Sequence, residues 1–396
     1  MTAVKIYEED QNFFVPHFKV ELDGTKLHDP VIRDVQQVTY RDSVSDAGAQ
    51  QGGGGGRNDQ IDSFELTLNN WDAETRTFKY EPPSSSQYDG LFAPGKELWL
   101  HMGYLSKLRL MLKGQITTIE PNFTESGPAT LSVRGLNVLH KFRKRQHTWA
   151  WPYKEKDSNI ALQLGQQAET RDRPGLGMRV VIHDAARNSE EPEFVFMNNQ
   201  YDISFLLDRA RRRGYALYLD QDDDGEFLFF GPSNQHVAPV TYVLEWGRSL
   251  SSFRPTLTTA NQVGQVTVRG WDRNRHRAFE GTAKIPEDCP VNGDLREVAR
   301  DVQGREEVIA DRPVRSEREA KEMAREILCN FRRDIVRGSG STVGLPDLRA
   351  GSRVVIRGLG TRFSGNYFVT SSTHTIGPNG YKTTFESRRE GPEEGA

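Results

Sequence analysis

A β pattern that occurs twice is the feature that most constrains the fold of this chain. FAPGKELWLHMGY at residues 92–104 parallels LRAGSRVVIRGLG at 348–360, since each has a turn ending in glycine, an alternating strand and a further glycine. FELTLNNWD at 64–72 likewise parallels GQVTVRGWD at 264–272, where an alternating strand leads into Trp-Asp. These two shared patterns, called marks below, occur in the same order in both parts of the chain, which predicts a duplicated β domain. The alternative is that any two β domains share such fragments.

The second copy is predicted to carry an insertion. The stretch between the two marks is short in the first copy, whereas in the second copy it contains a helical pattern. Ser316 and Glu319 form a capping box, and apolar residues follow at helical spacing. We therefore predict a helix at about 316–336, inserted into the second β domain. After the glycine-led strand, the similarity between the two copies continues, and Ile116 of the first copy is predicted to correspond to Val369 of the second.

Turn residues and changes of composition divide the chain into three parts and a tail. The predicted class is mainly β with α+β insertions: two similar β-barrel-like, tail-tube-like domains and a small α+β module. The Gly52–Gly56 run is not followed by Gly-Lys-Ser/Thr, so it is read as a flexible loop and not as a phosphate cradle. The predicted parts are a first β domain at 1–139 with a Gly-rich loop at 42–60, an α+β module at 140–238, a second β domain at 239–390 and a polar tail at 391–396.

The composition is that of a globular protein, with 36% hydrophobic and 27% charged residues. A formal net charge of −3 does not indicate a dedicated nucleic-acid binder. No apolar run approaches the ~18 residues of a membrane span, and the N-terminal residues lack a signal-peptide pattern. Cys289 and Cys329 show neither metal-ligand spacing nor a disulfide framework, which predicts reduced thiols and synthesis in a cytoplasm.

One acidic motif resembles the first half of a calcium-binding loop. Asp220, Asp222 and Asp224 alternate with other residues and are followed by Gly225. The position that needs a bidentate glutamate is Gly231, and strand patterns flank the motif where helices are required. We interpret the motif as the acidic turn of a hairpin and predict no metal site there.

A basic and aromatic segment at 141–154 is the candidate interaction surface. Its cations could contact phosphates and its tryptophans could stack on bases, but the near-neutral total charge favours a connector that packs or meets a protein partner. The candidate interface residues are Lys141, Arg143, Lys144, Arg145, Trp149 and Trp151.

No catalytic pattern is visible in the sequence. There is no H-E-x-x-H and no G-x-S-x-G, and the short glycine motifs lack the dinucleotide fingerprint. A pair of catalytic carboxylates cannot be selected from the 55 acidic residues. We predict no catalytic residue, no cofactor and no enzyme activity.

Three stretches resemble a known family. They are FMNNQYDISFLLDRARRRGYALYLDQDDDGEFLFFGP, WGRSLSSFRPTLTTANQVGQVTVRGWD and LRAGSRVVIRGLGTRFSGNYFVTSSTHTIGPNGYKTTF. In order, they are similar to the phage late control D family, the baseplate hub proteins of contractile tails, which are related to the N-terminal part of VgrG in type VI secretion. The resemblance covers about 190–390 well and the first β domain more loosely.

The resemblance implies a structural, non-enzymatic function. Hubs of this kind are homotrimers in which two similar β domains per chain adapt a six-fold inner tube to a three-fold spike. The implied partners are further copies of this chain, an inner-tube or tube-initiator protein, a spike protein and baseplate wedge proteins, with no membrane and no nucleic acid. VgrG-type chains continue into a spike, whereas this chain stops at Ala396, so we expect a separate spike protein. The implied location is a tail-like particle assembled in a bacterial cytoplasm.

Two other functions stay open at this point. A tail-associated cell-wall hydrolase would need a carboxylate pair or a metal constellation, which the sequence does not reveal. A nucleic-acid-binding protein would have to use the basic segment at 141–154, and its binding would weaken as salt concentration rises.

Overall fold

The computed structural model describes most of the chain. The described residues are 4–5, 13, 15–44, 62–80, 88, 90–105, 107–125, 127–190, 194–213, 215–222, 225–232, 242–260, 262–272, 275–285, 304–310, 314, 316–333 and 335–391. Most of the predicted Gly-rich loop lies outside the described residues, and its first two positions belong to a strand that ends at Ser43.

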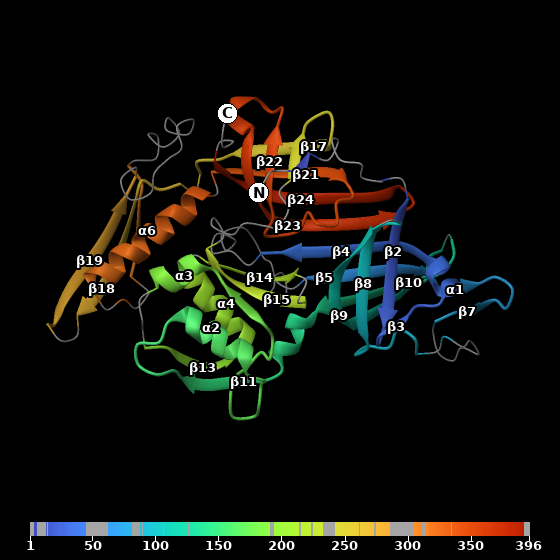
Figure 1. The fold of residues 1–396 in the computed structure, drawn as a ribbon, viewed down its shortest axis with the longest axis horizontal. Coiled ribbons are helices and arrows are strands. Elements are labelled where there is room, and N and C mark those ends of the chain that lie inside the picture. The colour runs from blue at the N-terminus through green and yellow to red at the C-terminus, as the bar shows by residue number, and fades with distance from the viewer. Residues whose placement is uncertain are drawn as a thin grey trace.

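The first β region is an antiparallel sheet in which two neighbouring pairs, β2 with β8 and β5 with β10, are not consecutive in the chain (Figure 1). Its spatial order is β3-β2-β8-β9-β10-β5-β4. Strand β5 alternates between buried and half-buried residues because one of its faces covers a hydrophobic core. The elements are β2 (Pro16–Leu22), β3 (Thr25–Lys26), α1 (Asp29–Asp34), β4 (Val35–Ser43), β5 (Ser63–Asn69), β6 (Trp71–Asp72), β7 (Thr77–Phe78), β8 (Glu97–Tyr104), β9 (Lys107–Asn122) and β10 (Thr130–Asn137).

The second β region covers a separate hydrophobic core at the top of Figure 1. Its spatial order is β16-β22-β23-β24-β21-β17, and the short strand β1 (Val4–Lys5) lies parallel to β16 at its edge. The elements are β16 (Tyr242–Glu245), β17 (Leu250–Leu257), β21 (Val336–Val343), β22 (Arg353–Arg357), α7 (Gly360–Phe363), β23 (Gly365–Gly377) and β24 (Gly380–Gly391).

The two β regions have the same connectivity. In chain order, β2, β4, β5, β8, β9 and β10 correspond to β16, β17, β21, β22, β23 and β24, and the spatial orders are identical. Neighbours are antiparallel in both regions, except that β16 and β22 run parallel whereas β2 and β8 run antiparallel. The predicted pair of similar β domains is confirmed, although no closed barrel occurs among the described residues.

The match between the glycine-led strands holds at the level of single hydrogen bonds. The Gly95 amide donates to the Ile116 carbonyl at 2.8 Å, and the Gly351 amide donates to the Val369 carbonyl at 2.9 Å. Both glycines have positive φ, 97° and 92°, which glycine adopts at low steric cost. The predicted correspondence of these strands, and of Ile116 with Val369, is therefore confirmed.

The other predicted correspondence, 64–72 with 264–272, is wrong. The counterpart of β5 is β21, whereas β18 (Gln265–Asp272) is the middle strand of a separate three-stranded sheet. In that sheet β18 pairs antiparallel with β19 (Arg277–Lys284) and parallel with β20 (Glu306–Ile309). An alternating strand followed by Trp-Asp specifies local extended structure but not which strands will be its neighbours, so the similarity misled.

The insertion in the second β region is larger than the predicted helix. The predicted helix is present as α6 (Glu317–Arg333), and it packs on β18 and β19 to enclose a small core of its own. Gly281 of β19 lies so close to α6 that a Cβ atom there would lie 2.1 Å from the backbone nitrogen of Lys321. This unit lies at the left of Figure 1 and falls between β17 and β21 in the chain.

The α+β module lies below the junction of the two β regions in Figure 1. Helices α2 and α4 pack on its sheets. Asp157 at the start of α2 accepts hydrogen bonds from Arg209 of α4 at 2.9 Å and from Arg213, the residue after α4, at 2.7 Å. The elements are η1 (Val138–Arg143), β11 (Gln146–Ala150), α2 (Asp157–Gln166), β12 (Val180–Ile182), α3 (Asp184–Ser189), β13 (Phe196–Tyr201), α4 (Asp202–Arg212), β14 (Tyr215–Asp222) and β15 (Gly225–Pro232).

Cys329 corrects one expectation from the sequence. It lies on α6 and is disulfide-bonded, whereas the absence of a multi-cysteine framework predicted reduced thiols. A single bridge leaves no repeated spacing in the sequence, so pattern reasoning had no signal for it.

Candidate functional site: the junction of the two sheets

The two β regions are joined through strand pairing between β4 and β23. Residues Val38–Ser43 of β4 pair antiparallel with Ile376–Ser371 of β23. Strand β23 pairs with β24 along one edge. Both β22 and β4 pair with its opposite edge, β22 with the first residues of β23 and β4 with the later ones, so β4 and β22 lie end to end. The result is one continuous sheet that passes from one hydrophobic core to the other.

A buried polar network fixes this junction. The Arg349 guanidinium lies 3.3 Å from Asp42 Oδ2, donates to the Met111 carbonyl at 3.0 Å and also bonds the Tyr40 hydroxyl. Asp42 in turn accepts from the Ser372 amide at 3.0 Å. The network therefore ties β4 and β9 of the first region to β23 and the β21–β22 loop of the second.

Two titratable groups next to this network, Asp62 near Asp42 and His374 at 3.1 Å from the Ser372 hydroxyl, have strongly shifted pKa values. Burial raises the pKa of Asp62 to about 7, and the nearby charge of Asp42 adds to the effect. Burial lowers the pKa of His374 to about 4. In both cases burial favours the neutral form of the side chain.

The α+β module covers the junction. Tyr218 and Phe229 of its sheet form an apolar cluster with Phe368 of β23 and Val44 next to β4. The approach is close, because a Cβ on Gly351 would lie 2.8 Å from the Tyr218 ring. Sequence reasoning missed this junction because its residues are separated by about three hundred positions, and no spacing rule connects them.

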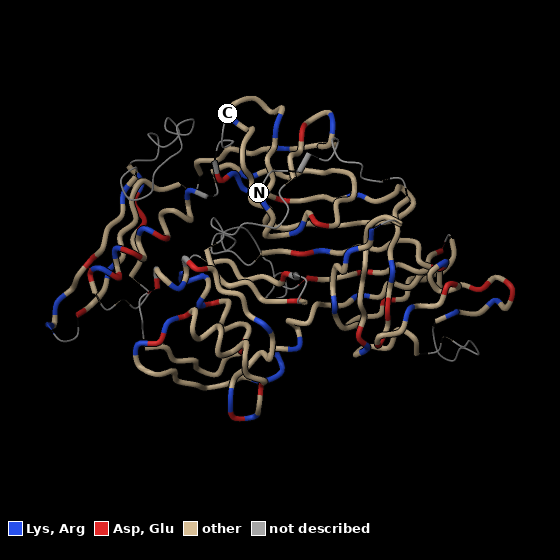
Figure 2. Tube along the Cα trace, viewed as in Figure 1, with Lys and Arg blue, Asp and Glu red and all other residues tan. Residues whose placement is uncertain are grey.

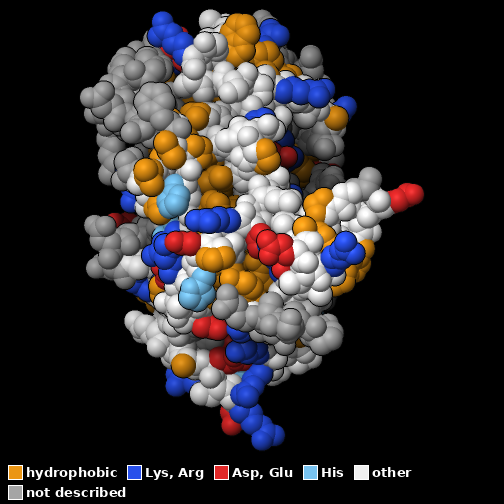
Figure 3. All heavy atoms as spheres, turned by 90° about the vertical axis from the view of Figure 1, so that its right-hand side faces the viewer, with side chains coloured by type: hydrophobic (Ala, Val, Ile, Leu, Met, Phe, Trp, Pro, Cys, Tyr) orange, Lys and Arg blue, Asp and Glu red, His pale blue; other side chains and the backbone are white. Residues whose placement is uncertain are grey.

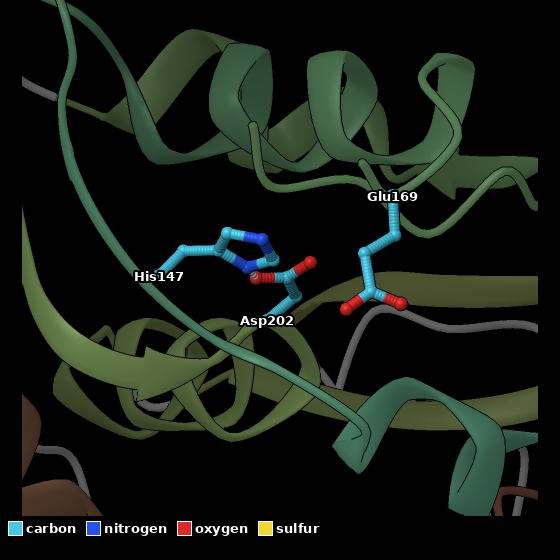
Figure 4. Close-up of side chains that lie close together, drawn as sticks. All are labelled: His147, Glu169 and Asp202. Carbon is cyan, nitrogen blue, oxygen red and sulfur yellow. Dashed lines mark hydrogen bonds and ion pairs between the residues drawn. The ribbon is translucent and has the colours of Figure 1, made fainter. Parts of the chain in front are cut away.

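A second cluster, in the α+β module, has the residue types of a metal site (Figure 4). Its members are His147, Glu169 and Asp202, whose ligand atoms lie within 4.8 Å of one another. His147 Nδ1 lies 2.8 Å from Asp202 Oδ1, and Nε2 lies 2.9 Å from the Thr170 carbonyl. The second carboxylate oxygen of Asp202 accepts from the Gly175 amide at 2.9 Å.

These contacts describe a structural ion pair. A carbonyl only accepts, so His147 Nε2 carries a proton, and Nδ1 faces a carboxylate. Burial disfavours the imidazolium, but the bonds to Thr170 and Asp202 outweigh burial and raise the pKa of His147. Both ring nitrogens are thus occupied, and the cluster holds β11 against the start of α4.

The predicted interface residues are spread over different environments. Trp151 is 4% exposed and stacks on Phe205 at 4.9 Å, so its ring is part of the core and does not form a surface platform. Trp149 is half-buried, and Lys141 lies 3.6 Å from Glu97 of β8. The remaining cations are Arg143, which is half-buried, and Lys144 and Arg145, which are exposed.

The acidic motif lies at a hairpin. Strands β14 and β15 pair antiparallel as far as Asp222 and Gly225, and Asp220 pairs with Phe227 in the same ladder. Asp224 lies outside the described residues.

Charges of both signs are interspersed along the described chain, and no element carries a long run of one sign (Figure 2). Figure 3, which faces the right-hand end of Figure 1, shows hydrophobic side chains between cations and anions. This face therefore has no broad basic surface of the kind that a nucleic-acid backbone requires.

Comparison with protein families places most of the chain in one of them. The family described as the Alg8 N-terminal domain matches residues 57–377, and the chain belongs to that family. This is not the late control D family that the sequence motifs resemble. No curated protein matches the chain.

Solved structures share the fold over nearly the whole chain. The tail protein from Neisseria meningitidis MC58 is 12% identical, with a TM-score of 0.63, over 95% of this chain and 97% of that one. The 43 kDa tail protein of prophage MuSo2 from Shewanella oneidensis is 11% identical, with a TM-score of 0.63, over 94% and 98%. A component of the type VI secretion system of E. coli is 14% identical, with a TM-score of 0.54, over 94% and 77%.

The helices that the structure describes are all too short or too polar to cross a membrane.

Proposed function

We propose that this protein is a structural hub of a contractile injection particle, in which three copies join a six-fold inner tube to a separate three-fold spike. The observation that carries the proposal is the repeated connectivity of the two β regions, which are joined strand to strand within one chain. Three chains with two like regions each supply six like positions around an axis. The hub therefore acts mechanically, by holding its shape between tube and spike.

The solved structures support this class of function. Two with the same fold are described as tail proteins, and a third as a type VI component similar to the T4 tail proteins gp27 and gp5. The late control D family, the division at 1–139, 140–238 and 239–390, and assembly in a bacterial cytoplasm belong to the same proposal. The proposed partners are tube, spike and wedge proteins. One of them would bind the exposed side chains of Lys144 and Arg145.

The proposal includes the absence of enzyme activity. A cell-wall hydrolase is the competing function, and the His147 cluster is the group of the described chain with the residue types of a metal site. The His147 and Asp202 side chains of this cluster bond each other, the Thr170 carbonyl and the Gly175 amide, which are structural contacts. A peptidoglycan zymogram of the purified chain should show no clearing, and a clearing zone lost in His147→Gln would favour the hydrolase.

The direct test is the mass of the assembly in solution. Sedimentation of the purified chain, alone and with the candidate spike protein from a neighbouring gene, should give a species of three chains. Electron-microscopic averages of that species should show a ring with six similar lobes. A chain that stays monomeric with tube and spike proteins present would refute the proposal.

A further inference from the structure

We infer that β17 of one copy pairs with the outer part of β9 of a second copy, in the register that β4 and β23 use within one chain. The inference rests on the proposed function in one respect, because it requires several copies in one assembly. It goes further by naming the two strand edges that meet and the residues that lie opposite each other.

Both strands have an edge to offer. β9 pairs with β8 over Lys107–Gln115, and beyond Ile116 no described strand pairs with that edge, while β10 occupies the other. β17 pairs with β21 on one side, and no described strand lies on its other side. An unpaired strand edge is a template for another strand.

The internal junction shows what these edges are built to do. β23 is the counterpart of β9, and β4 is the counterpart of β17, and within the chain β23 and β4 pair with each other. Each chain therefore makes this contact once, between the second region and the first. The complementary edges, β9 of the first region and β17 of the second, cannot meet that way within the chain and are left for other copies.

Matching irregularities fix the correspondence residue by residue. The ladder of β9 with β10 skips Thr117, and the ladder of β23 with β24 skips Thr370, so Ile119 corresponds to Ser372. The ladder of β4 with β5 skips Gln36, and that of β17 with β21 skips Ser251. Each bulge occurs at the same place in the two regions, and bulges pin register.

Transferring the β4–β23 register to the free edges sorts the side chains by polarity. On one face three apolar pairs form, and on the other three polar pairs form. A slip of one residue would destroy this sorting, because it moves every side chain to the opposite face. The apolar pairs are Ile119–Leu257, Pro121–Pro255 and Phe123–Phe253, and the polar pairs are Thr118–Thr258, Glu120–Thr256 and Asn122–Arg254, the second residue of each belonging to the other copy.

Phe123 gives independent support. Its side chain is 61% exposed, although its counterpart in the second region is Ile376, which is 8% exposed and packs in the core of the first region. In the proposed contact Phe123 would enter the core of the second region of another copy, next to Phe253. An exposed aromatic at a position that is buried in the duplicate is what an unfilled interface leaves.

Charge and hydrogen bonding are compatible with this contact. Glu120 and Arg254 are exposed and become diagonal neighbours, within reach of long side chains. Pro121 and Pro255 face each other and supply no amide hydrogen, so the ladder depends on the pairs on either side. Proline at a free edge also discourages pairing with unrelated strands.

The test is a disulfide across the predicted pair. Asn122 and Arg254 are both exposed. A chain with Asn122→Cys and Arg254→Cys carries one thiol on the free edge of β9 and one on the free edge of β17. Directly opposed residues of an antiparallel pair have Cβ atoms about 4.5–5.5 Å apart, against about 3.5–4.5 Å in a disulfide, so a small local shift closes the bridge. Mild oxidation should give covalent dimers and a closed covalent trimer on a non-reducing gel. Each single variant should give no ladder, and Asn122→Cys with Thr256→Cys should cross-link far less.

A second variant keeps the inference testable if the thiols do not react. Phe123→Ser should weaken trimers at least tenfold in dissociation constant. The ring is exposed and contacts Phe78 at 5.1 Å, so the melting temperature of the monomer should fall by only a few degrees. Phe196→Ser, which removes a 52% exposed phenylalanine of the α+β module, is the matched control and should leave assembly unchanged.

The outcomes separate this inference from the proposed function. Trimers that neither cross-link at this pair nor respond to Phe123→Ser would overturn the strand pairing and leave the hub intact. A chain that stays monomeric in every condition would overturn both. Cross-linking at the shifted pair instead of the matched one would overturn the register.

Discussion

Replacing Asp62 by asparagine should expose a pH dependence that the native junction cancels. Asp62 has a folded-state pKa of about 7 against an ordinary value of 3.8, so between these limits the folded state holds a proton that the unfolded state has lost. Its contribution to stability is complete below pH 3.8 and is lost as the pH rises through 7. His374 has a folded-state pKa of about 4 against 6.5, so its contribution is lost as the pH falls through that window.

The two effects oppose each other over nearly the same range. One pKa unit corresponds to about 1.4 kcal/mol, so Asp62 accounts for a change on the order of 4 kcal/mol and His374 for one of about 3 kcal/mol with opposite sign. The native protein should therefore show nearly constant stability from these groups between pH 4 and 6.5. In Asp62→Asn the His374 effect is no longer opposed by Asp62, so the stability of the variant relative to the native protein should rise with pH.

The measurement is urea unfolding followed by tryptophan fluorescence at pH 4.5, 5.5, 6.5 and 7.5. The gain in unfolding free energy of Asp62→Asn over the native protein should grow with pH by a few kcal/mol and level off above 7. Glu125→Gln, at an exposed carboxylate, is the control and should show a constant difference. A constant difference for Asp62→Asn as well would show that this carboxyl is ionised in the fold and would refute the reasoning.

Three further substitutions test other parts of the fold. Arg209→Ala leaves the buried Asp157 carboxylate with Arg213 as its remaining charged partner in the described contacts and should cost about 3–5 kcal/mol in urea unfolding, whereas a loss below 1 kcal/mol would contradict the burial. Gly281→Ala pushes α6 off its sheet and should increase amide exchange across α6, while Gly304→Ala, which has open space around it, should not. Gly351→Ala combines positive φ with contact to a tyrosine ring, and a melting temperature lowered by less than 1 °C would contradict the structure.

Local features of the fold could be predicted from the sequence. The capping box at Ser316 identified α6, and the amide of Glu319 indeed bonds the Ser316 hydroxyl at 3.1 Å. Gly95 and Gly351 identified matching turns because positive φ restricts the residue type strongly. Such signals work because the physical requirement and the residues that meet it are adjacent in the chain.

Features that depend on distant partners could not be predicted. Asp42 and Arg349 are 307 positions apart, and neither has a neighbour pattern that indicates a buried ion pair. The strand at 264–272 reads as a copy of 64–72, because alternation is set by burial of one face and is the same for any half-buried strand. Only the pairing partners distinguish the two strands, and pairing is a property of the whole fold.

The place of the inserted unit has a consequence for how a finished ring would present itself. Strands β18–β20 and α6 occupy the connection between β17 and β21, which in the first region is the glycine-rich stretch between β4 and β5. Around an assembly of three chains, folded attachments and glycine-rich connections would alternate. A neighbour that touches the sheets would meet sixfold repetition, whereas one that touches these connections would meet threefold repetition, so one polypeptide could display both symmetries through a single divergent loop.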